Sequence, residues 1–242
     1  GAGGLGNAVI PYLASSGVGT IGVIDGDTVA YSNLHRQIMF AEQDIRASKS
    51  EKICTKLGKQ FSDISFEAYN AFLSEQNALK IFSKYDLIVD ATDSIAARYL
   101  INDACILTQK PFVHASIYRF QFQVASFNVA QSGSYRCLYP IPPKNAQSCA
   151  EAGVMPTTVA LAGLYQANEV FKYFLGIGEM LTNKMLLVDT LSNRHDSFAY
   201  TTKEHAFLTP SYFTDTYSPI EKIRFEETEA EGFFLDVRNE DE

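Results

Sequence analysis

A glycine-rich loop at the start of the chain, followed by an aspartate, restricts the fold more than any other feature of the sequence. Residues 1–6 read GAGGLG, which contains G-x-G-x-x-G, and Asp25 closes an apolar run about 20 residues further on. Such glycines let backbone amides approach a phosphate at the positive end of a helix, and the carboxylate suits ribose hydroxyls. The pattern predicts a nucleotide site and fits a dinucleotide or ATP equally. Because a strand normally precedes this loop, we expect one upstream of Gly1.

Short apolar segments alternate with amphipathic segments along most of the chain. They predict strands at residues 20–25, 64–69, 86–91, 111–115, 118–129, 184–189 and 197–201. They predict helices at residues 7–16, 43–61, 74–82, 95–107 and 157–175. Continuously apolar strands indicate an α/β, Rossmann-like fold: a mostly parallel central sheet with helices on both faces and an antiparallel extension at residues 118–129. Ligands of such sheets bind beyond the carboxyl ends of the strands, where Asp25 and the turn at residues 91–93 fall.

Composition and charge disfavour several other classes of protein. The 242 residues suffice for one large domain, or for one domain and part of another. The net charge of −8 and the pI of about 5.1 oppose general binding to nucleic acid or to an anionic membrane. No apolar run approaches the ~20 residues that span a bilayer, and no segment resembles a signal peptide. We therefore expect a cytoplasmic protein that binds neither nucleic acid nor membrane.

Two cations and a second aspartate distinguish the possible nucleotides. Arg36 lies in SNLHRQ at residues 32–37, and Lys49 lies near the start of a helix. A triphosphate needs more compensating positive charge than a pyrophosphate bridge, so these cations favour ATP, although a lone cation is usually a solvated surface residue. Asp93 could hold Mg²⁺, which prefers one or two carboxylates with phosphate oxygens, or it could cap the following helix.

Further motifs occur in order with these residues. They are DGD at residues 25–27, ATDS at 91–94 followed by Arg98 and Asn102, YRC at 135–137, and CAEAGV at 149–154. Together with the glycine loop, SNLHRQ and Lys49, they resemble the bacterial E1-like enzymes that adenylate sulfur-carrier proteins. These are the MoeB and ThiF enzymes of molybdopterin and thiamine biosynthesis. The resemblance runs in order from Gly1 to about Tyr200.

The resemblance implies an ATP-dependent adenylyltransferase with Mg²⁺ as its metal. Asp25 would bind the ribose, Arg36 and Lys49 the phosphates, and Asp93 the Mg²⁺. The nucleotide-binding residues would be Gly1, Gly3, Gly4, Gly6, Asp25, Asp27, Asn33, Arg36, Gln37, Lys49 and Asp93. The substrate would be the C-terminal glycine of a ubiquitin-like sulfur carrier that ends in Gly-Gly, and pyrophosphate would be released. The family forms homodimers in which the partner subunit supplies an arginine from upstream of the glycine loop, and that arginine is not in this sequence.

The four cysteines raise two separate questions. They are Cys54, Cys105, Cys137 and Cys149, and they contain no C-x-x-C pair. The family usually holds a structural zinc on two such pairs, but residues 134–137 read SYRC and no cysteine follows Asp189. One thiolate does not complete a tetrahedral site, so we predict no zinc. Cys149 matches the position at which some members bind the carrier covalently, which makes it a candidate catalytic thiol, and a structural cysteine is the equal alternative.

Composition and the resemblance together predict three parts of the chain. Residues 1–208 would form the adenylation domain, and the polar, acidic residues 209–232 would form a linker. Residues 233–242 would begin a rhodanese domain, because FLDVR at 234–238 resembles the opening of that domain. Some members of the family carry a rhodanese domain behind the adenylating domain.

Two other functions are compatible with parts of the pattern. An NAD-dependent Rossmann oxidoreductase would use the glycines and Asp25, but it would give Arg36, Lys49 and Asp93 no task. A non-catalytic E1-like scaffold would keep the fold and bind a carrier or a partner subunit. Such a scaffold would have no need of the same three residues.

Overall fold

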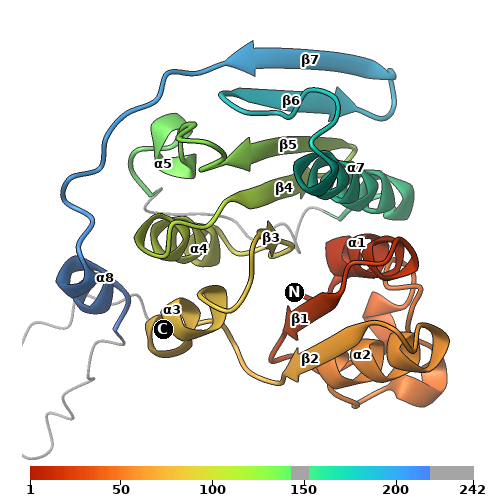
Figure 1. The fold of residues 1–242 in the computed structure, drawn as a ribbon. Helices are drawn as coiled ribbons and strands as arrows, with labels where there is room; N and C mark the ends of the chain where they lie inside the picture. Colours follow the sequence, from red (N-terminus) through yellow and green to blue (C-terminus); the bar gives the residue numbers. More distant parts are fainter. Residues whose placement is uncertain (143–152, 219–242) are drawn as a thin grey trace, which may run out of the picture.

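The strands form two sheets in the computed structural model, which describes residues 1–142 and 153–218 (Figure 1). Within these residues, β1 (Thr20–Ile24) and β2 (Ser65–Tyr69) make a parallel pair. The second sheet has the strand order β3 (Ile88–Asp90), β4 (Phe112–Tyr118), β5 (Gln121–Phe127), β6 (Lys184–Asp189) and β7 (Arg194–Ala199). Strands β3 and β4 are parallel, and the pairs from β4 to β7 are antiparallel. The predicted α/β fold with an antiparallel extension is confirmed.

The antiparallel part of the sheet is larger than the sequence indicated, because tight turns join its strands. The prediction of a single strand over residues 118–129 is wrong at its start, since the chain reverses at Arg119 and Phe120 between β4 and β5. Arg119 has a φ of 55°, which a strand does not accommodate. Asn193, in the turn between β6 and β7, also has a φ of 55°. Strands joined by such short turns pair antiparallel.

One face of the second sheet is covered by α7 (Pro156–Leu175), and α1 (Gly4–Ser15) packs on α7 (Figure 1). Val9 of α1, Val170 of α7 and Val113 of β4 belong to the same buried apolar cluster. Helix α7 ends at Leu175, as the sequence predicts, and begins one residue before the predicted range, at Pro156. This packing fixes the direction in which α1 leaves the glycine loop.

The opposite face of the second sheet carries α3 (Glu75–Phe82) and α4 (Ile95–Leu107). Side chains alternate along a strand, so Phe112 of β4 joins this second cluster while Val113 joins the first. Helix α4 has the bounds that the sequence predicts. Its position matters for the site because it begins directly after the turn at the end of β3.

A folded helix begins inside the range predicted as a linker, residues 209–232. Helix α8 (Pro210–Tyr217) is capped by Thr209, whose hydroxyl accepts a backbone N–H of the first turn. Its Phe213 has no exposed surface and lies in the cluster on the α4 side of the sheet. The first part of that range is therefore folded onto the domain. Residues 219–232 and the expected rhodanese segment, 233–242, lie outside the described residues.

Helix α2 (Lys49–Gln60) packs against the β1–β2 pair and begins later than the predicted range, 43–61. Arg46 has a φ of 72°, which interrupts a right-handed helix, and Ser48 caps the helix that follows. Backbone hydrogen bonds tie this segment to Val29, on the loop after β1. The helix therefore begins beside the end of β1.

The remaining helices of the described residues are short. They are the 3₁₀ helices η1 (Tyr31–Asn33) and η2 (Glu42–Asp44) and the single turn α5 (Tyr135–Leu138). Among all the described residues, no helix combines the length and apolar character needed to cross a membrane.

Gly163→Ala should destabilise the domain, because α1 and α7 meet at that glycine. A Cβ on Gly163 would lie 2.8 Å from the carbonyl oxygen of Leu5 and 2.7 Å from the Cβ of Ala8. We expect urea denaturation to show a loss of roughly 1–3 kcal/mol in the free energy of unfolding. Gly58 of α2 is the matched control, since its Cβ would meet Phe66 at an ordinary 3.7 Å. Gly58→Ala should raise stability by up to about 1 kcal/mol, and equal effects of the two changes would contradict the close packing.

Candidate active site

Asp25 joins the glycine loop to the end of β1. Its Oδ2 accepts the backbone N–H of Ala2 at 2.7 Å, and its Oδ1 accepts the N–H of Asp27 at 2.9 Å. A Cβ on Gly6 would lie 2.1 Å from the carbonyl oxygen of Gly1, so the first turn of α1 admits no larger residue there. Each carboxylate oxygen has a second lone pair, so Asp25 keeps the capacity to accept ribose hydroxyls while it braces the loop.

The loop after β1 brings Arg36 and Gln37 to the glycines. A Cβ on Gly4 would lie 3.6 Å from Cγ of Arg36, and one on Gly3 would lie 3.8 Å from Nε2 of Gln37. The carbonyl of Asn33 holds this turn by accepting the N–H groups of Arg36 at 3.1 Å and Gln37 at 3.0 Å. Gln37 is buried, and its Oε1 has no hydrogen-bond partner in the described part of the chain. The amide oxygen of Gln37, buried beside the glycine loop, is available to accept a hydrogen bond from a ligand.

Lys49 is the buried cation of the site. It begins α2, and its Nζ lies 3.0 Å from Oδ2 of Asp27, whose side chain is 56% exposed. A bound phosphate would compete with this exposed carboxylate for the lysine, and the N-terminus of α2 adds positive potential. Arg36 is more accessible than Lys49, and its Nη1 donates to the carbonyl of Ser32 at 3.2 Å.

Asp93 lies on the turn after β3, beside the glycine loop. A Cβ on Gly1 would lie 2.8 Å from the carbonyl oxygen of Ala91, so the loop and the turn are in contact. Ser94 caps α4 by accepting the N–H of Ala97, which makes the interpretation of Asp93 as the helix cap wrong. The Asp93 side chain is exposed and has no hydrogen bond or ion pair with any other described residue. It is therefore available to a metal ion bound to phosphates.

Two buried residues to which the sequence did not point lie next to this turn. Asp90 and His114 have no exposed surface, and Nδ1 of His114 lies 2.6 Å from Oδ2 of Asp90. Nε of Arg98 lies 3.9 Å from the same oxygen. A histidine within an apolar strand gives no local sign of such a contact, because its partner is on another strand.

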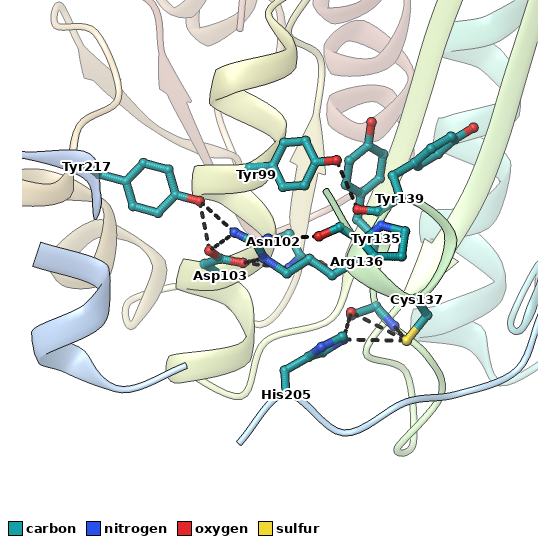
Figure 2. Close-up of polar contacts among 11 residues, drawn as sticks. Tyr99, Asn102, Asp103, Tyr135, Arg136, Cys137, Tyr139, His205 and Tyr217 are labelled. Carbon is teal, nitrogen blue, oxygen red and sulfur yellow. Dashed lines mark hydrogen bonds and ion pairs between the residues drawn. The ribbon is translucent and has the colours of Figure 1, made fainter. Parts of the chain in front are cut away.

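A hydrogen-bonded cluster occupies the position of the family's first cysteine pair (Figure 2). Nε2 of His205 lies 2.7 Å from Oγ of Ser134 and 3.6 Å from Sγ of Cys137. The same sulfur accepts the backbone N–H of Lys203 at 3.3 Å. One thiol, one imidazole and one hydroxyl do not fit a structural zinc, which takes four Cys or His ligands. The described residues contain no group of three or more acidic, His or Cys side chains that could hold a metal, and the absence of zinc stays a prediction.

A buried ion pair beside this cluster holds α5 and α8 on α4 (Figure 2). Arg136 donates from Nε and Nη2 to the two carboxylate oxygens of Asp103, at 2.7 and 2.8 Å. Tyr217 of α8 donates to Oδ2 of Asp103 at 2.8 Å. Burial by itself would lower the pKa of Arg136, but the hydrogen bonds to Asp103 outweigh it and raise the pKa. These direct contacts join α5 and α8 through α4.

The cysteines of the described residues are core residues. Cys54, Cys105 and Cys137 are all buried, and none of them forms a disulfide. Burial raises the pKa of the Cys54 thiol to about 11 and raises that of Cys105 as well, so both are protonated at neutral pH. Cys149 lies outside the described residues, and its role as a catalytic thiol stays a prediction.

The chain belongs to the ThiF family, whose model matches residues 1–208. It is 43% identical over 198 residues to the sulfur carrier protein adenylyltransferase of Thermus thermophilus, a match that covers 79% of this chain and 73% of that protein. It is 40% identical over 196 residues to adenylyltransferase and sulfurtransferase MOCS3 of Xenopus laevis, a match that covers 80% of this chain and 44% of that protein. The chain thus spans less than half of that relative. The resemblance to the family of E1-like adenylating enzymes is confirmed.

Solved structures agree with this assignment at the level of the fold. The crystal structure of E. coli MccB with MccA-N7isoASN superimposes with a TM-score of 0.75 at 23% identity. The superposition covers 84% of this chain and 63% of that one.

Treatment with a zinc chelator should leave the protein's stability unchanged, because Ser134, Cys137 and His205 hydrogen-bond directly to one another. Metal analysis of the purified full-length protein should find no stoichiometric zinc. Its thermal unfolding temperature should be the same with and without a zinc chelator. A retained zinc ion that is lost in Cys137→Ser, together with a fall in unfolding temperature on chelation, would contradict the prediction.

Proposed function

We propose that this domain uses ATP and Mg²⁺ to adenylate the C-terminal glycine of a ubiquitin-like sulfur carrier protein, with release of pyrophosphate. One observation carries the proposal: Asp25 and Asp27 link the glycine loop to the buried cation Lys49, and the same loop contacts the turn that carries the unpaired carboxylate of Asp93. The relatives from T. thermophilus and X. laevis are both named adenylyltransferases, which supports it. The carrier would end in Gly-Gly and serve molybdopterin or thiamine biosynthesis.

The reaction requires alignment and charge neutralisation more than acid–base catalysis. The carboxylate of the carrier is ionised at neutral pH, so it needs no general base to attack the α-phosphate. Arg36 and Lys49 would offset the charge that grows on the leaving pyrophosphate, once Lys49 exchanges Asp27 for a phosphate. Asp93 would hold Mg²⁺, which, when bound, supplies further positive charge to the phosphate oxygens. Asp25 would orient the ribose, and the glycine loop would bind phosphate through its N–H groups.

Three further parts of the proposal extend beyond the described residues. The protein would be a homodimer in which the partner subunit supplies an arginine to each site. Residues 219–232, the part of the predicted linker after α8, would separate the adenylation domain from a rhodanese domain that begins at 233–242. That second domain would deliver sulfur to the adenylated carrier, and the name of the X. laevis relative, adenylyltransferase and sulfurtransferase, supports the pairing of the two activities.

Two other functions leave more of the site without a purpose. An NAD-dependent oxidoreductase would use the glycine loop and Asp25, but it would not need a buried lysine or a free carboxylate at Asp93. A non-catalytic scaffold would not need Lys49 buried at the start of α2. An ATP site would use all four features: the glycine loop, Asp25, Lys49 and Asp93.

The full-length protein should catalyse ATP–pyrophosphate exchange only in the presence of a carrier with an intact Gly-Gly terminus. Candidate carriers should be compared with the same carriers lacking those two residues. Asp93→Asn should lower the exchange rate by about 100-fold or more, because it removes the carboxylate that would hold Mg²⁺. Asp63→Asn is the matched control, since Asp63 is an exposed acid just before β2, and it should leave the rate unchanged.

Other outcomes would each change the proposal. Equal exchange with intact and shortened carriers would show that the terminal glycine is not the acceptor. A full rate in Asp93→Asn would remove that residue from the mechanism. ATP binding without exchange for any carrier would favour the scaffold.

A further inference from the structure

His114 belongs to a polar group that is closed off from solvent beside the turn carrying Asp93. It pairs with Asp90 in the register of β4 and β3, and neither residue has exposed surface. A carboxylate oxygen accepts, so Nδ1 of His114 carries the proton in the 2.6 Å contact with Oδ2. Burial lowers the pKa of the imidazole, although Asp90 opposes this, so the ring is neutral at pH 7. Its Nε2 has no partner among the described residues.

The carboxylate of Asp90 also binds the backbone of the turn. Its Oδ1 accepts the N–H of Thr92 at 3.1 Å. Arg98 balances the charge, with Nε 3.9 Å from Oδ2 of Asp90, and its Nη2 donates to the carbonyl of Thr92 at 3.4 Å. Thr92 lies between Ala91, which contacts the glycine loop, and Asp93. One buried carboxylate thus holds the backbone on which both parts of the site depend.

The strand ends themselves are fixed by a different side chain. Nε2 of Gln166, on α7, donates to the carbonyl of Asp90 at 2.7 Å and to that of Val113 at 3.2 Å. Loss of the imidazole donor would therefore leave β3 and β4 in register. It would leave one oxygen of a buried carboxylate without a hydrogen bond, and the side chain would be free to turn away from Thr92.

We propose that His114 is a positioning residue of the nucleotide site. By holding the carboxylate of Asp90 it fixes the turn at residues 91–93, and so sets where Asp93 meets a divalent cation bound to phosphate. The inference rests on the proposed function, because it assigns His114 a task in the site for ATP and Mg²⁺. It adds a residue that touches neither the nucleotide nor the metal.

Three variants of the full-length protein test the proposal. His114→Phe keeps a ring and removes the donor, and His114→Asn keeps an N–H donor near the position of Nδ1. His114→Gln places its amide near the position of Nε2, where it does not reach Asp90 as Nδ1 does. It replaces His114→Phe in the test if the phenylalanine variant does not fold. Phe112→Leu is the matched control, because Phe112 lies on the same strand and the same face but belongs to the apolar cluster.

Two measurements are made on each variant. Hydrogen exchange of peptides covering residues 91–98, without nucleotide, reports on the N–H of Thr92. Titration with ATP at a series of Mg²⁺ concentrations gives the affinity of each variant for ATP and for Mg²⁺. We expect His114→Phe to speed exchange in these peptides and to weaken binding of ATP with Mg²⁺ roughly 10- to 100-fold. His114→Asn should stay within about threefold of the wild type, because it retains the donor.

The outcomes separate this inference from the proposed function. Wild-type affinity in His114→Phe and His114→Gln, or unchanged exchange at residues 91–98, would overturn the role of His114. Equal weakening in Phe112→Leu would also overturn it, since the effect would then follow general stability. Failure of the wild type to bind ATP with Mg²⁺ would overturn the proposed function, and the positioning role would fall with it.

Discussion

The hydrogen bonds of the Asp25 carboxylate hold the site together. One oxygen binds the N–H of Ala2 in the glycine loop, and the other binds the N–H of Asp27, which pairs with Lys49. A single side chain at the end of β1 therefore connects the phosphate-binding loop with the cation at the start of α2. Because the aspartate is ionic, each of these hydrogen bonds is stronger than one between neutral groups.

Lys49 keeps its place because the segment before α2 is anchored by a buried carboxylate, that of Asp44. Asp44 is almost fully buried and pairs with Lys56 at 2.5 Å and with Lys52 at 3.1 Å. Burial raises the pKa of Asp44, but the lysines and the N–H of Ala41 lower it to about 2 from the ordinary 3.8. The pKa is lower in the folded state, so this stabilisation is complete well above pH 3.8 and is lost as the pH falls toward 2. The anchor persists throughout the neutral range.

Local signals in the sequence predicted much of the fold and suggested the residues of the proposed site. The bounds of α4 were predicted from the apolar period, although the cap is Ser94 and not Asp93, the residue that the sequence suggested. The glycine loop and Asp25 were identifiable from their spacing along the chain, whereas the roles of Lys49 and Asp93 were assigned through the resemblance to the family. The late start of α2 was not predictable, because it depends on the positive φ of Arg46 and on its contact with Val29.

Contacts between distant segments could not be predicted from the sequence. The register that sets His114 against Asp90 is a property of two strands 24 residues apart, and neither strand specifies it alone. The same holds for Asp103, which binds Arg136 and Tyr217 from two separate helices. The segment predicted as a linker is mostly polar, yet buried Phe213, together with Tyr217 packed against the same cluster, docks α8 on the domain.

The most direct test of this account is the affinity of the full-length protein for ATP with Mg²⁺ compared with its affinity for NAD, measured by calorimetry. A site with Lys49 and an unpaired Asp93 should bind ATP, with an affinity that depends on Mg²⁺ and falls in Asp93→Asn, and it should bind NAD weakly or not at all. Tight NAD binding, with ATP affinity that is indifferent to Mg²⁺ and to Asp93, would contradict the account.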